Sequence, residues 1–480
     1  MPLIKLILTL ALPFLLGYCI VGLLIKNKPT ISFLERFSLA WGIGIGLLGL
    51  EMFTLSLAGI PLNLPVVSIP IIVIVFIMML YLYAKKIPLI DLSSLKSLSK
   101  ELKTINQGDH RWRNAAEILL IILILLTIFF VFFDATIKPI VNFDDLWRQG
   151  SIAKIIFVSG KVITEQTVEL AGPHPFLNPL SQAWIYMGTE SWNDALGKII
   201  FALCYTSLLL IFYANLRKQS SRLFSLLFAY LFTSFPLIIY HAGTAYSDLM
   251  QTFYYSAGII YLFQWMRQGE HADLYFSALL LGIGNFVKQS GIPLWVIATI
   301  VLFIYIFIEK KDELKRGGIF ILISFLISAP WLFYQNSFLM RQITNLGGKI
   351  SAVFGKSAII GSNAVVSTNM PLTIPTLSDI FYHLGRRMFT YTDWQILYFI
   401  LVIIILFAWK EIWRSNIKYL LLLLSLNLAL VIYAFTDPGT YAYLVDGTLV
   451  ERLMMYHAPI ALFILSILAA HIISSEPAGK

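Results

Sequence analysis

Long apolar runs separated by short polar segments dominate this chain from end to end. A helix needs about 20 consecutive apolar residues to cross the hydrocarbon core of a bilayer. About 13 runs approach that length, and the sequence therefore predicts an all-α polytopic membrane protein with about 13 transmembrane helices. The predicted spans lie near residues 3–25, 37–58, 66–84, 115–134, 195–215, 222–240, 248–266, 273–289, 291–308, 318–335, 396–410, 418–435 and 454–473.

The composition agrees with a membrane protein. Apolar residues occupy 58% of the 480 positions and charged residues only 13%, which is too few to cover the surface of a soluble protein of this size. The formal net charge of +9 does not indicate nucleic-acid binding, because Lys and Arg lie mostly in short loops between the apolar runs. We expect the lipid bilayer as a partner of this chain, and no nucleic acid.

Basic residues also orient the spans, because cytoplasmic loops of membrane proteins are enriched in Lys and Arg. The segment 85–114 is strongly basic, and alternation from there places the basic segments 26–36, 217–222, 310–316 and 410–418 on the same side. That side is predicted to be cytoplasmic. We expect a multi-pass protein of the bacterial inner membrane.

Two long segments, 135–194 and 336–395, then lie outside, and we expect both to carry interfacial helices. Residues 145–158 mix apolar and polar positions in a way that is typical of a helix lying in the membrane interface, although an ordinary amphipathic connector has the same pattern. The predicted organisation is a three-span module with its cytoplasmic loop (1–114), a central transmembrane module with the first external loop (115–335), and a C-terminal part with the second external loop (336–480).

Two acidic motifs lie at the external ends of predicted spans. Asn142-Phe143-Asp144-Asp145 follows the fourth span, and neighbouring side chains project in different directions, so at most one of the two acids faces a given substrate. Tyr246-Ser247-Asp248 stands where the chain re-enters the membrane. Simpler explanations exist for each: an acidic pair can decorate an interface, and the helix dipole favours an acid near a helix N-terminus.

Basic residues occur on the same predicted side. Lys288-Gln289-Ser290 interrupts an apolar stretch and breaks the positive-inside pattern. A charged residue in such a position is costly and indicates a functional site, although a lysine can also extend its charged end to the membrane interface. Glu451-Arg452 precedes the last span, and Arg386 and Arg387 lie in the second external segment. One membrane face is thus predicted to gather carboxylates and strong cations.

That combination suits the transfer of a sugar from a lipid-linked phosphate. A carboxylate can take the proton of an acceptor hydroxyl or amine as it attacks the anomeric carbon. Lys and Arg can hold the departing phosphate through charge-assisted hydrogen bonds that strengthen as negative charge develops. Such a site belongs at the bilayer surface, because the lipid tail of the donor stays among the helices.

Four motifs taken in order resemble a known family. They are Asp144-Asp145-Leu146-Trp147 followed by Ala153, Tyr246-Ser247-Asp248-Leu249, the segment from Gly284 through Lys288 to Gly291, and Arg452 ahead of Pro459 in the last span. Their order, spacing and shared face resemble the GT-C superfamily of membrane glycosyltransferases, particularly its protein O-mannosyltransferase and aminoarabinose transferase branch. The resemblance covers roughly residues 115–473 and leaves the first three spans outside.

The resemblance implies a GT-C-like architecture and roles for individual residues. A polyprenyl-phosphate sugar would be the donor, and a protein or a glycolipid on the external, periplasmic face would be the acceptor. The implied catalytic residues are Asp144, Asp145 and Asp248, and Asp144 versus Asp145 stays open because many members have Asp-Glu where this chain has Asp-Asp. The implied phosphate-binding residues are Lys288, Arg452, Arg386 and Arg387, and the implied sugar or acceptor pocket contains Trp147, Tyr246 and Gln289.

Metal dependence varies within the superfamily, so a divalent cation is a candidate cofactor. His241 lies close to Asp248 in the sequence, and His457 follows Arg452. Asp and His side chains at one face can bind a divalent metal. A His at the end of a span is, however, more often an interfacial hydrogen-bonding residue.

Two other functions use many spans. A transporter or flippase of lipid-linked saccharides would need ionisable residues buried mid-membrane, and Glu51 in the second span is the clearest such residue. An O-antigen ligase or polymerase type of enzyme would depend mainly on external Arg and His. The acidic motifs at the outer ends of the spans favour the transferase over both.

Overall fold

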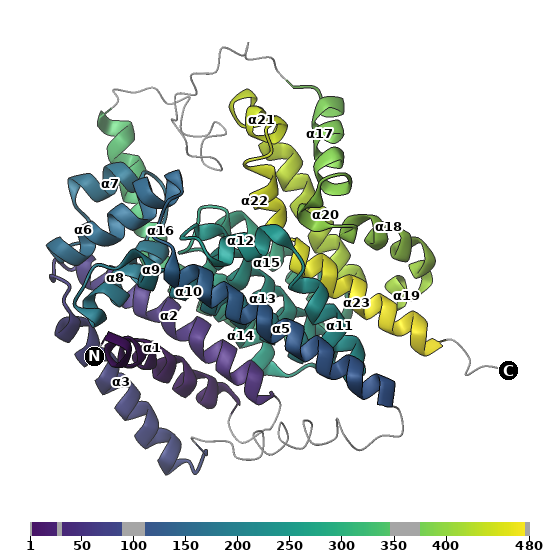
Figure 1. Ribbon diagram of the computed structural model, residues 1–480, viewed down its shortest axis with the longest axis horizontal. Coiled ribbons are helices and arrows are strands. Elements are labelled where there is room, and N and C mark those ends of the chain that lie inside the picture. Colours follow the sequence, from purple (N-terminus) through teal and green to yellow (C-terminus); the bar gives the residue numbers. More distant parts are fainter. Residues whose placement is uncertain (1, 26–30, 89–110, 346–374, 476–480) are drawn as a thin grey trace.

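The computed structural model describes residues 2–25, 31–88, 111–345 and 375–475 (Figure 1). Most of the predicted basic loop 85–114, part of the basic segment 26–36, and the middle of the second external segment 336–395 lie outside the described residues. Every regular element within those ranges is helical. The helices are α1 (Pro2–Ile25), α2 (Phe33–Leu57), α3 (Leu64–Ala84), α5 (Arg111–Ile137), η2 (Asp145–Gly150), α6 (Ser151–Ser159), α7 (Glu165–Ala171), α8 (Leu177–Thr189), α9 (Asp194–Gly197), α10 (Ile199–Arg217), α11 (Arg222–Phe232), α12 (Pro236–Ala242), α13 (Ser247–Gln268), α14 (His271–Gly284), α15 (Gly291–Glu309), η3 (Lys311–Glu313), α16 (Leu314–Asn345), α17 (Leu377–Phe389), η5 (Thr392–Trp394), α18 (Leu397–Phe407), α19 (Trp409–Arg414), α20 (Ile417–Ala434), α21 (Pro438–Val445), α22 (Val450–Met455) and α23 (Ala458–Ser475).

Eight helices in the described part of the chain are long and apolar enough to cross a membrane. This agrees with a polytopic membrane protein, the fold class that the apolar runs predict. Two further apolar helices are shorter, Leu397–Phe407 and Ala458–Ile473. The eight are Leu3–Ile25, Phe33–Leu57, Leu64–Ala84, Arg111–Ile137, Asp194–Arg217, Gly291–Glu309, Lys311–Ser337 and Ile417–Ala434.

The predicted span at 222–240 consists of two helices in the structure. α11 and α12 meet at an angle of 72° across residues 233–235. Pro236 occupies the first turn of α12, and Phe235 before it is extended, with φ −76° and ψ 109°. Proline disfavours the helical conformation in the residue that precedes it, so the apolar run bends there. The bend directs α12 and the loop after it toward the candidate site described below.

α13 is the most enclosed long helix, and 20 of its 22 residues are buried. It packs against α10 and α14, while α2 packs against α8, α10 and α14. α13 is long enough to span a bilayer but is not among the eight apolar spans, because polar side chains such as Gln251, Thr252 and Gln264 interrupt it. α13 is therefore surrounded mainly by other helices and not by lipid.

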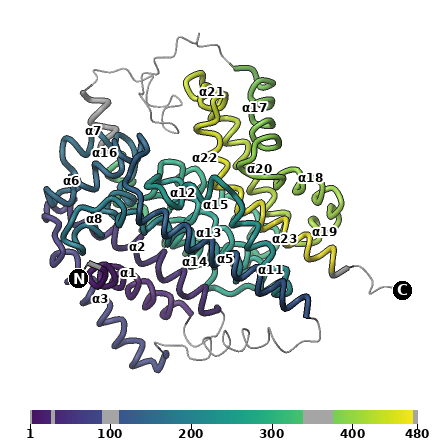
Figure 2. Tube along the Cα trace, viewed as in Figure 1, coloured from purple at the N-terminus to yellow at the C-terminus, as the bar shows by residue number. Residues whose placement is uncertain are grey.

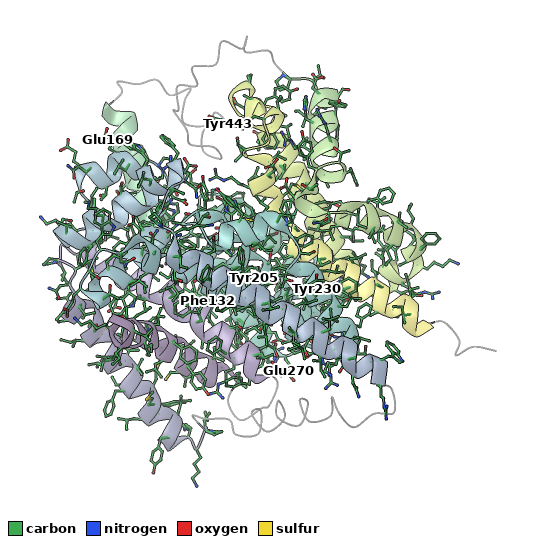
Figure 3. The ribbon with its side chains drawn as sticks, viewed as in Figure 1. Phe132, Glu169, Tyr205, Tyr230, Glu270 and Tyr443 are labelled. Atoms are coloured by element: carbon green, nitrogen blue, oxygen red, sulfur yellow. The ribbon has the colours of Figure 1, made fainter. Side chains whose placement is uncertain are left out.

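Short helices from distant parts of the sequence gather at one end of the bundle. Figure 2 shows α6 and α7 on the same upper side of the molecule as α17, α21 and α22. In Figure 3, Glu169 on α7 and Tyr443 on α21 lie in that upper part, whereas Glu270, in the turn after α13, lies at the lower edge. α13 thus runs from the end that carries the short helices to the opposite end. The predicted helix at 145–158 is present as η2 and α6.

Candidate functional site

Asp248, in the first turn of α13, lies at the centre of a network of charged side chains. The side chain is fully buried. One carboxylate oxygen, Oδ1, accepts hydrogen bonds from Lys288 Nζ at 2.5 Å and from the Tyr456 hydroxyl at 2.7 Å. The other, Oδ2, accepts from Arg452 Nε at 3.0 Å. Asp248 therefore does more than favour a helix N-terminus, because it binds two cations from separate parts of the chain.

The tight turn between α14 and α15 presents Lys288 to this carboxylate. A Cβ atom on Gly291 would lie 2.3 Å from the carbonyl oxygen of Gly284, so only glycine allows the two helix ends to approach this closely. Lys288 Nζ also donates to the Tyr456 hydroxyl at 3.0 Å. Gln289, beside it, donates to the Pro173 carbonyl at 2.8 Å and so anchors the turn to the first external segment.

Arg452 joins the two acidic motifs. Its Nη1 donates to Asp144 Oδ2 at 3.1 Å, while its Nε binds Asp248. Its guanidinium carbon lies 4.8 Å from the ring centroid of Tyr246, in a cation–π arrangement. Tyr456 follows Arg452 by four positions, and residues at that spacing share one face of a helix. The spacing was visible in the sequence, although Tyr456 was not among the predicted site residues.

The neighbouring acids Asp144 and Asp145 have different surroundings. The Asp144 side chain is 39% exposed, whereas Asp145 is 1% exposed. Asp145 Oδ2 accepts hydrogen bonds from the Ala245 backbone N–H at 2.9 Å and from Asn142 Nδ2 at 3.2 Å. Burial raises the pKa of Asp145 to about 7, against the opposing effect of these hydrogen bonds. Only Asp144 is open to a substrate.

The loop that leads into α13 is fixed by buried polar side chains. Asn178 on α8 donates to the Ala245 carbonyl at 2.7 Å and to the Ser247 hydroxyl at 3.0 Å. Lys198 is also buried and donates to the Gly243 carbonyl at 3.0 Å. The carbonyls of Gly243 and Ala245 and the hydroxyl of Ser247 are therefore held by buried side chains, which positions the start of α13 and Asp248.

Two further basic groups from the first external segment lie near this network. His174 has its pKa lowered to about 3, first by burial and then by the positive charges of Arg148 and Lys288. Burial also lowers the pKa of Arg148, against the opposing effect of Asp144. Sequence reasoning missed His174 and Arg148, because nothing in their local pattern distinguishes them from other loop residues.

Several predicted residues lie elsewhere. Arg387 Nη1 binds Glu451 Oε1 at 2.6 Å, and its guanidinium lies 4.1 Å from the ring centroid of Tyr391. Arg386 is exposed and lies near the same Tyr391 ring. Neither arginine contacts Asp144 or Asp248. Trp147 is exposed, at 64%.

The candidate metal site is not assembled. No three His, Cys, Asp or Glu side chains within the described ranges come close enough together to hold a metal ion. Both carboxylate oxygens of Asp248 are occupied by cations. His457 instead lies beside the rings of Tyr255 and Tyr456, with centroids 6.2 and 6.4 Å away. The set His241, Asp248 and His457 therefore does not form a metal centre in this structure.

We name the residues Asp144, Asp248, Lys288, Arg452 and Tyr456 the ionic cluster. It contains two carboxylates and two cations that come from four separate segments of the chain. Comparison with family models, with curated proteins and with solved structures found no significant match. The function must therefore be inferred from the chemistry of this cluster and its surroundings.

Proposed function

We propose that the chain is a membrane glycosyltransferase that moves a sugar from a polyprenyl-phosphate donor to a protein or glycolipid acceptor on the outer face of the membrane. The proposal includes a GT-C-like arrangement of about 13 spans, counting the shorter and more polar helices. One observation carries it: the half-exposed Asp144 shares Arg452 with the buried Asp248, which also binds Lys288. A carboxylate that is chemically able to accept a proton and two cations that are able to bind a phosphate therefore lie together.

The two cations retain hydrogen-bonding capacity for a phosphate. Lys288 has three N–H groups, and Asp248 and the Tyr456 hydroxyl take two of them among the described residues. Arg452 has five, of which Asp248 and Asp144 take two in the same part of the chain. The side chains of Lys288 and Arg452 are 14% and 26% exposed. Both can reach an anion that arrives from the surface.

The proposed reaction uses Asp144 as the general base. The acceptor oxygen or nitrogen attacks the anomeric carbon, its proton passes to Asp144, and the bond between that carbon and the phosphate oxygen breaks. Lys288 and Arg452 stabilise the negative charge that develops on the departing phosphate. A phosphate bound to Arg452 competes with Asp144 for the guanidinium, which frees the carboxylate. Asp145 positions the loop before α13.

Exposed apolar side chains beside Asp144 fit a donor with a long hydrocarbon tail. Phe143, Leu146 and Trp147 are 78%, 52% and 64% exposed. Contiguous apolar residues on a surface indicate contact with a membrane or a partner, and an exposed tryptophan is typical of the membrane interface. These residues are the proposed entrance through which the prenyl tail remains in lipid while its phosphate reaches the ionic cluster.

Donor binding can be tested without knowledge of the sugar. The detergent-solubilised full chain is heated with a polyprenyl monophosphate or with the matching polyprenol, which lacks the phosphate. We expect the phosphate form to raise the Tm and the alcohol to have little effect. Lys288→Ala is expected to abolish this difference, while Lys161→Ala, which removes an exposed lysine from the segment 135–194, keeps it. Equal stabilisation by both lipids would contradict a phosphate site.

Catalysis requires a separate test. A panel of polyprenyl-phosphate sugars is supplied in proteoliposomes, and release of the polyprenyl phosphate is measured. We expect Asp144→Asn to lower turnover by about 10²-fold or more, as loss of a general base does, while stabilisation by the polyprenyl monophosphate persists. Glu169→Gln on α7, labelled in Figure 3, is the matched control because that carboxylate is also exposed. Full activity of Asp144→Asn would remove it as the base.

A further inference from the structure

A second charged feature lies at the other end of α13. A cleft of about 870 Å³ opens between the α10–α11 turn, the end of α13, the α19–α20 turn and the last turns of α23. α13 begins at the ionic cluster and has 22 residues, so at 1.5 Å per residue its two ends lie about 33 Å apart. The cleft therefore cannot be part of the candidate active site.

The rim of the cleft is basic. Arg217, Lys218, Arg267 and Arg414 line it, against a single carboxylate, Glu411. Lys218 is already bound to Glu35 on α2. Arg267 is exposed, and no acidic side chain in the described part of the chain pairs with it.

Arg414 is loosely engaged, whereas Glu411 lies 3.1 Å from His471 Nε2 and Arg217 donates to the Ser220 carbonyl at 2.7 Å. The Arg414 side chain is 76% exposed, and its Nη1 lies 3.9 Å from Glu411 Oε1, too far for a hydrogen bond. The amide nitrogen of Gln219 is buried and finds no acceptor among the described residues. Buried polar groups normally have a partner. A bound anion would supply acceptors to both side chains.

The inner wall of the cleft is apolar. Phe224 on α11, Phe263 on α13 and Leu468 on α23 line it. An inorganic anion gains nothing from such a surface, whereas the glycerol and upper acyl carbons of a lipid would bury apolar area there. The cleft thus combines a basic rim with an apolar interior, which matches the two parts of an anionic lipid.

Aromatic residues place the cleft at a membrane surface. Trp409 and Trp413 lie on the short helix α19, which carries Glu411 and Arg414, and the two residues are 53% and 57% exposed. Their ring centroids are 5.5 Å apart. Exposed tryptophans in a multi-span protein concentrate at the level of the lipid headgroups. The positive-inside pattern predicts that this end is the cytoplasmic one.

We infer that this cleft binds the phosphate headgroup of an anionic membrane lipid from the leaflet at the basic end of the helices. Arg267 and Arg414 contact the phosphate, the Gln219 amide donates to a headgroup oxygen, and the acyl chains leave along α11 and α23. The site is independent of the proposed sugar transfer, and its occupancy can be measured whether or not the chain is a transferase.

The test uses the full chain in detergent, with phosphatidylglycerol, phosphatidylcholine and inorganic phosphate as probes. Bound lipid is counted by native mass spectrometry over a concentration series. We expect phosphatidylglycerol to bind at least tenfold more tightly than phosphatidylcholine, and the double variant Arg267→Gln/Arg414→Gln to lose about tenfold in that affinity. The control Lys310→Gln/Lys311→Gln removes two exposed charges from another loop at the same end and should bind like the wild type.

Three results would overturn the inference. An equal loss of phosphatidylglycerol affinity in the control variant would mean that lipid binding depends on overall charge and not on the cleft. Equal affinity for phosphatidylglycerol and phosphatidylcholine would remove the phosphate-recognising role of the arginines. Competition by inorganic phosphate at lipid-like concentrations would identify a soluble anion as the ligand. Thermal unfolding of each variant, measured in parallel, separates lost binding from lost folding.

Discussion

The two ends of α13 each hold a buried carboxylate, and the difference between them separates a structural ion pair from a candidate site. At one end Asp248 binds Lys288, Arg452 and Tyr456. Near the other end, fully buried Glu35 on α2 binds Lys218 at 2.7 Å and accepts from the Tyr261 hydroxyl at 3.3 Å.

The Glu35 network is closed. Glu35 Oε2 accepts a hydrogen bond from the backbone N–H of Ser32 at 2.9 Å in a helix-capping arrangement, and Glu35 Oε1 accepts hydrogen bonds from Lys218 and Tyr261. Both oxygens are satisfied by one cation and neutral donors, and the network joins α2, α10 and α13. It contains one cation, and its carboxylate is fully buried, so burial of an ion pair alone does not indicate a functional site.

The ionic cluster around Asp248 is open. It holds two cations, it extends through Arg452 to Asp144, and the Asp144 side chain is 39% exposed. Cations with remaining N–H groups next to an accessible carboxylate can exchange partners, whereas the Glu35 network can only hold helices together. A second cation and an exposed carboxylate, Asp144, are what distinguish the two ends.

The largest expected effect is that of Asp248→Asn. It leaves Lys288 and Arg452 without their buried carboxylate, and removal of one partner of a buried ion pair costs about 3–5 kcal/mol. The measurement is the free energy of unfolding in mixed micelles. Asp446→Asn, at an exposed loop acid, serves as control. A loss below about 1 kcal/mol would mean that the cluster does not stabilise the fold and that the contrast with Glu35 is wrong.

The second prediction concerns pH. The pKa of Asp145 is raised from 3.8 to about 7 by burial, so the folded state binds this proton more tightly than the unfolded state does. Its contribution is therefore most favourable below about pH 4 and declines as the pH rises to about 7, by as much as ~1.4 kcal/mol per pH unit.

Asp145→Asn isolates that contribution. The difference in unfolding free energy between wild type and variant, measured from pH 5 to pH 8, should shift in favour of the variant as the pH increases. A difference independent of pH would show that Asp145 is ionised throughout, and would place it with Asp144 as a second accessible acid.

Glu35→Gln should have a smaller and purely structural effect. Lys218 is 19% exposed and can be partly solvated, so we expect a loss of about 1–3 kcal/mol. The Tm increase caused by a polyprenyl monophosphate should be unchanged, unlike in Lys288→Ala. Loss of that increase in Glu35→Gln would erase the distinction between a closed and an open network.

Glu51→Gln is expected to have the smallest effect. Neither carboxylate oxygen of Glu51 on α2 has a hydrogen-bond partner among the placed residues. An amide avoids the cost of a buried charge. The free energy of unfolding should therefore change by less than about 1 kcal/mol, and the rate of sugar transfer by less than about twofold. A transporter would instead depend on this residue. If Glu51→Gln abolished the movement of a labelled lipid-linked sugar across the vesicle membrane, and the wild-type chain transferred no sugar, a transporter would be favoured.

Sequence reasoning succeeded where a single local property determined the result. Long apolar runs indicated the membrane fold, and the order of the polar interruptions identified Asp144, Asp248, Lys288 and Arg452, which the structure brings together. Adjacency in the sequence could not tell which of Asp144 and Asp145 is buried, because that depends on the Ala245 loop a hundred positions later. Their catalytic roles stay predictions.

Other features depend on tertiary structure. Arg387 is a candidate phosphate-binding residue in the sequence, and in the structure it binds Glu451. The window at 222–240 is apolar enough for a span, but its apolar pattern does not reveal the angle of 72° between α11 and α12. His457 follows Arg452 directly, but successive residues on a helix point in different directions, so it faces Tyr255 and cannot join Asp248 at a metal.

The enclosed position of α13 has a consequence for how the protein is made. Gln251, Thr252 and Gln264 are all buried against other helices, and a segment with such side chains inserts poorly into lipid alone. It requires α10 on one side and α14 on the other. Since α14 is synthesised after α13, biogenesis must shelter this helix until the following one emerges, and a chain that ends between them would expose it to degradation.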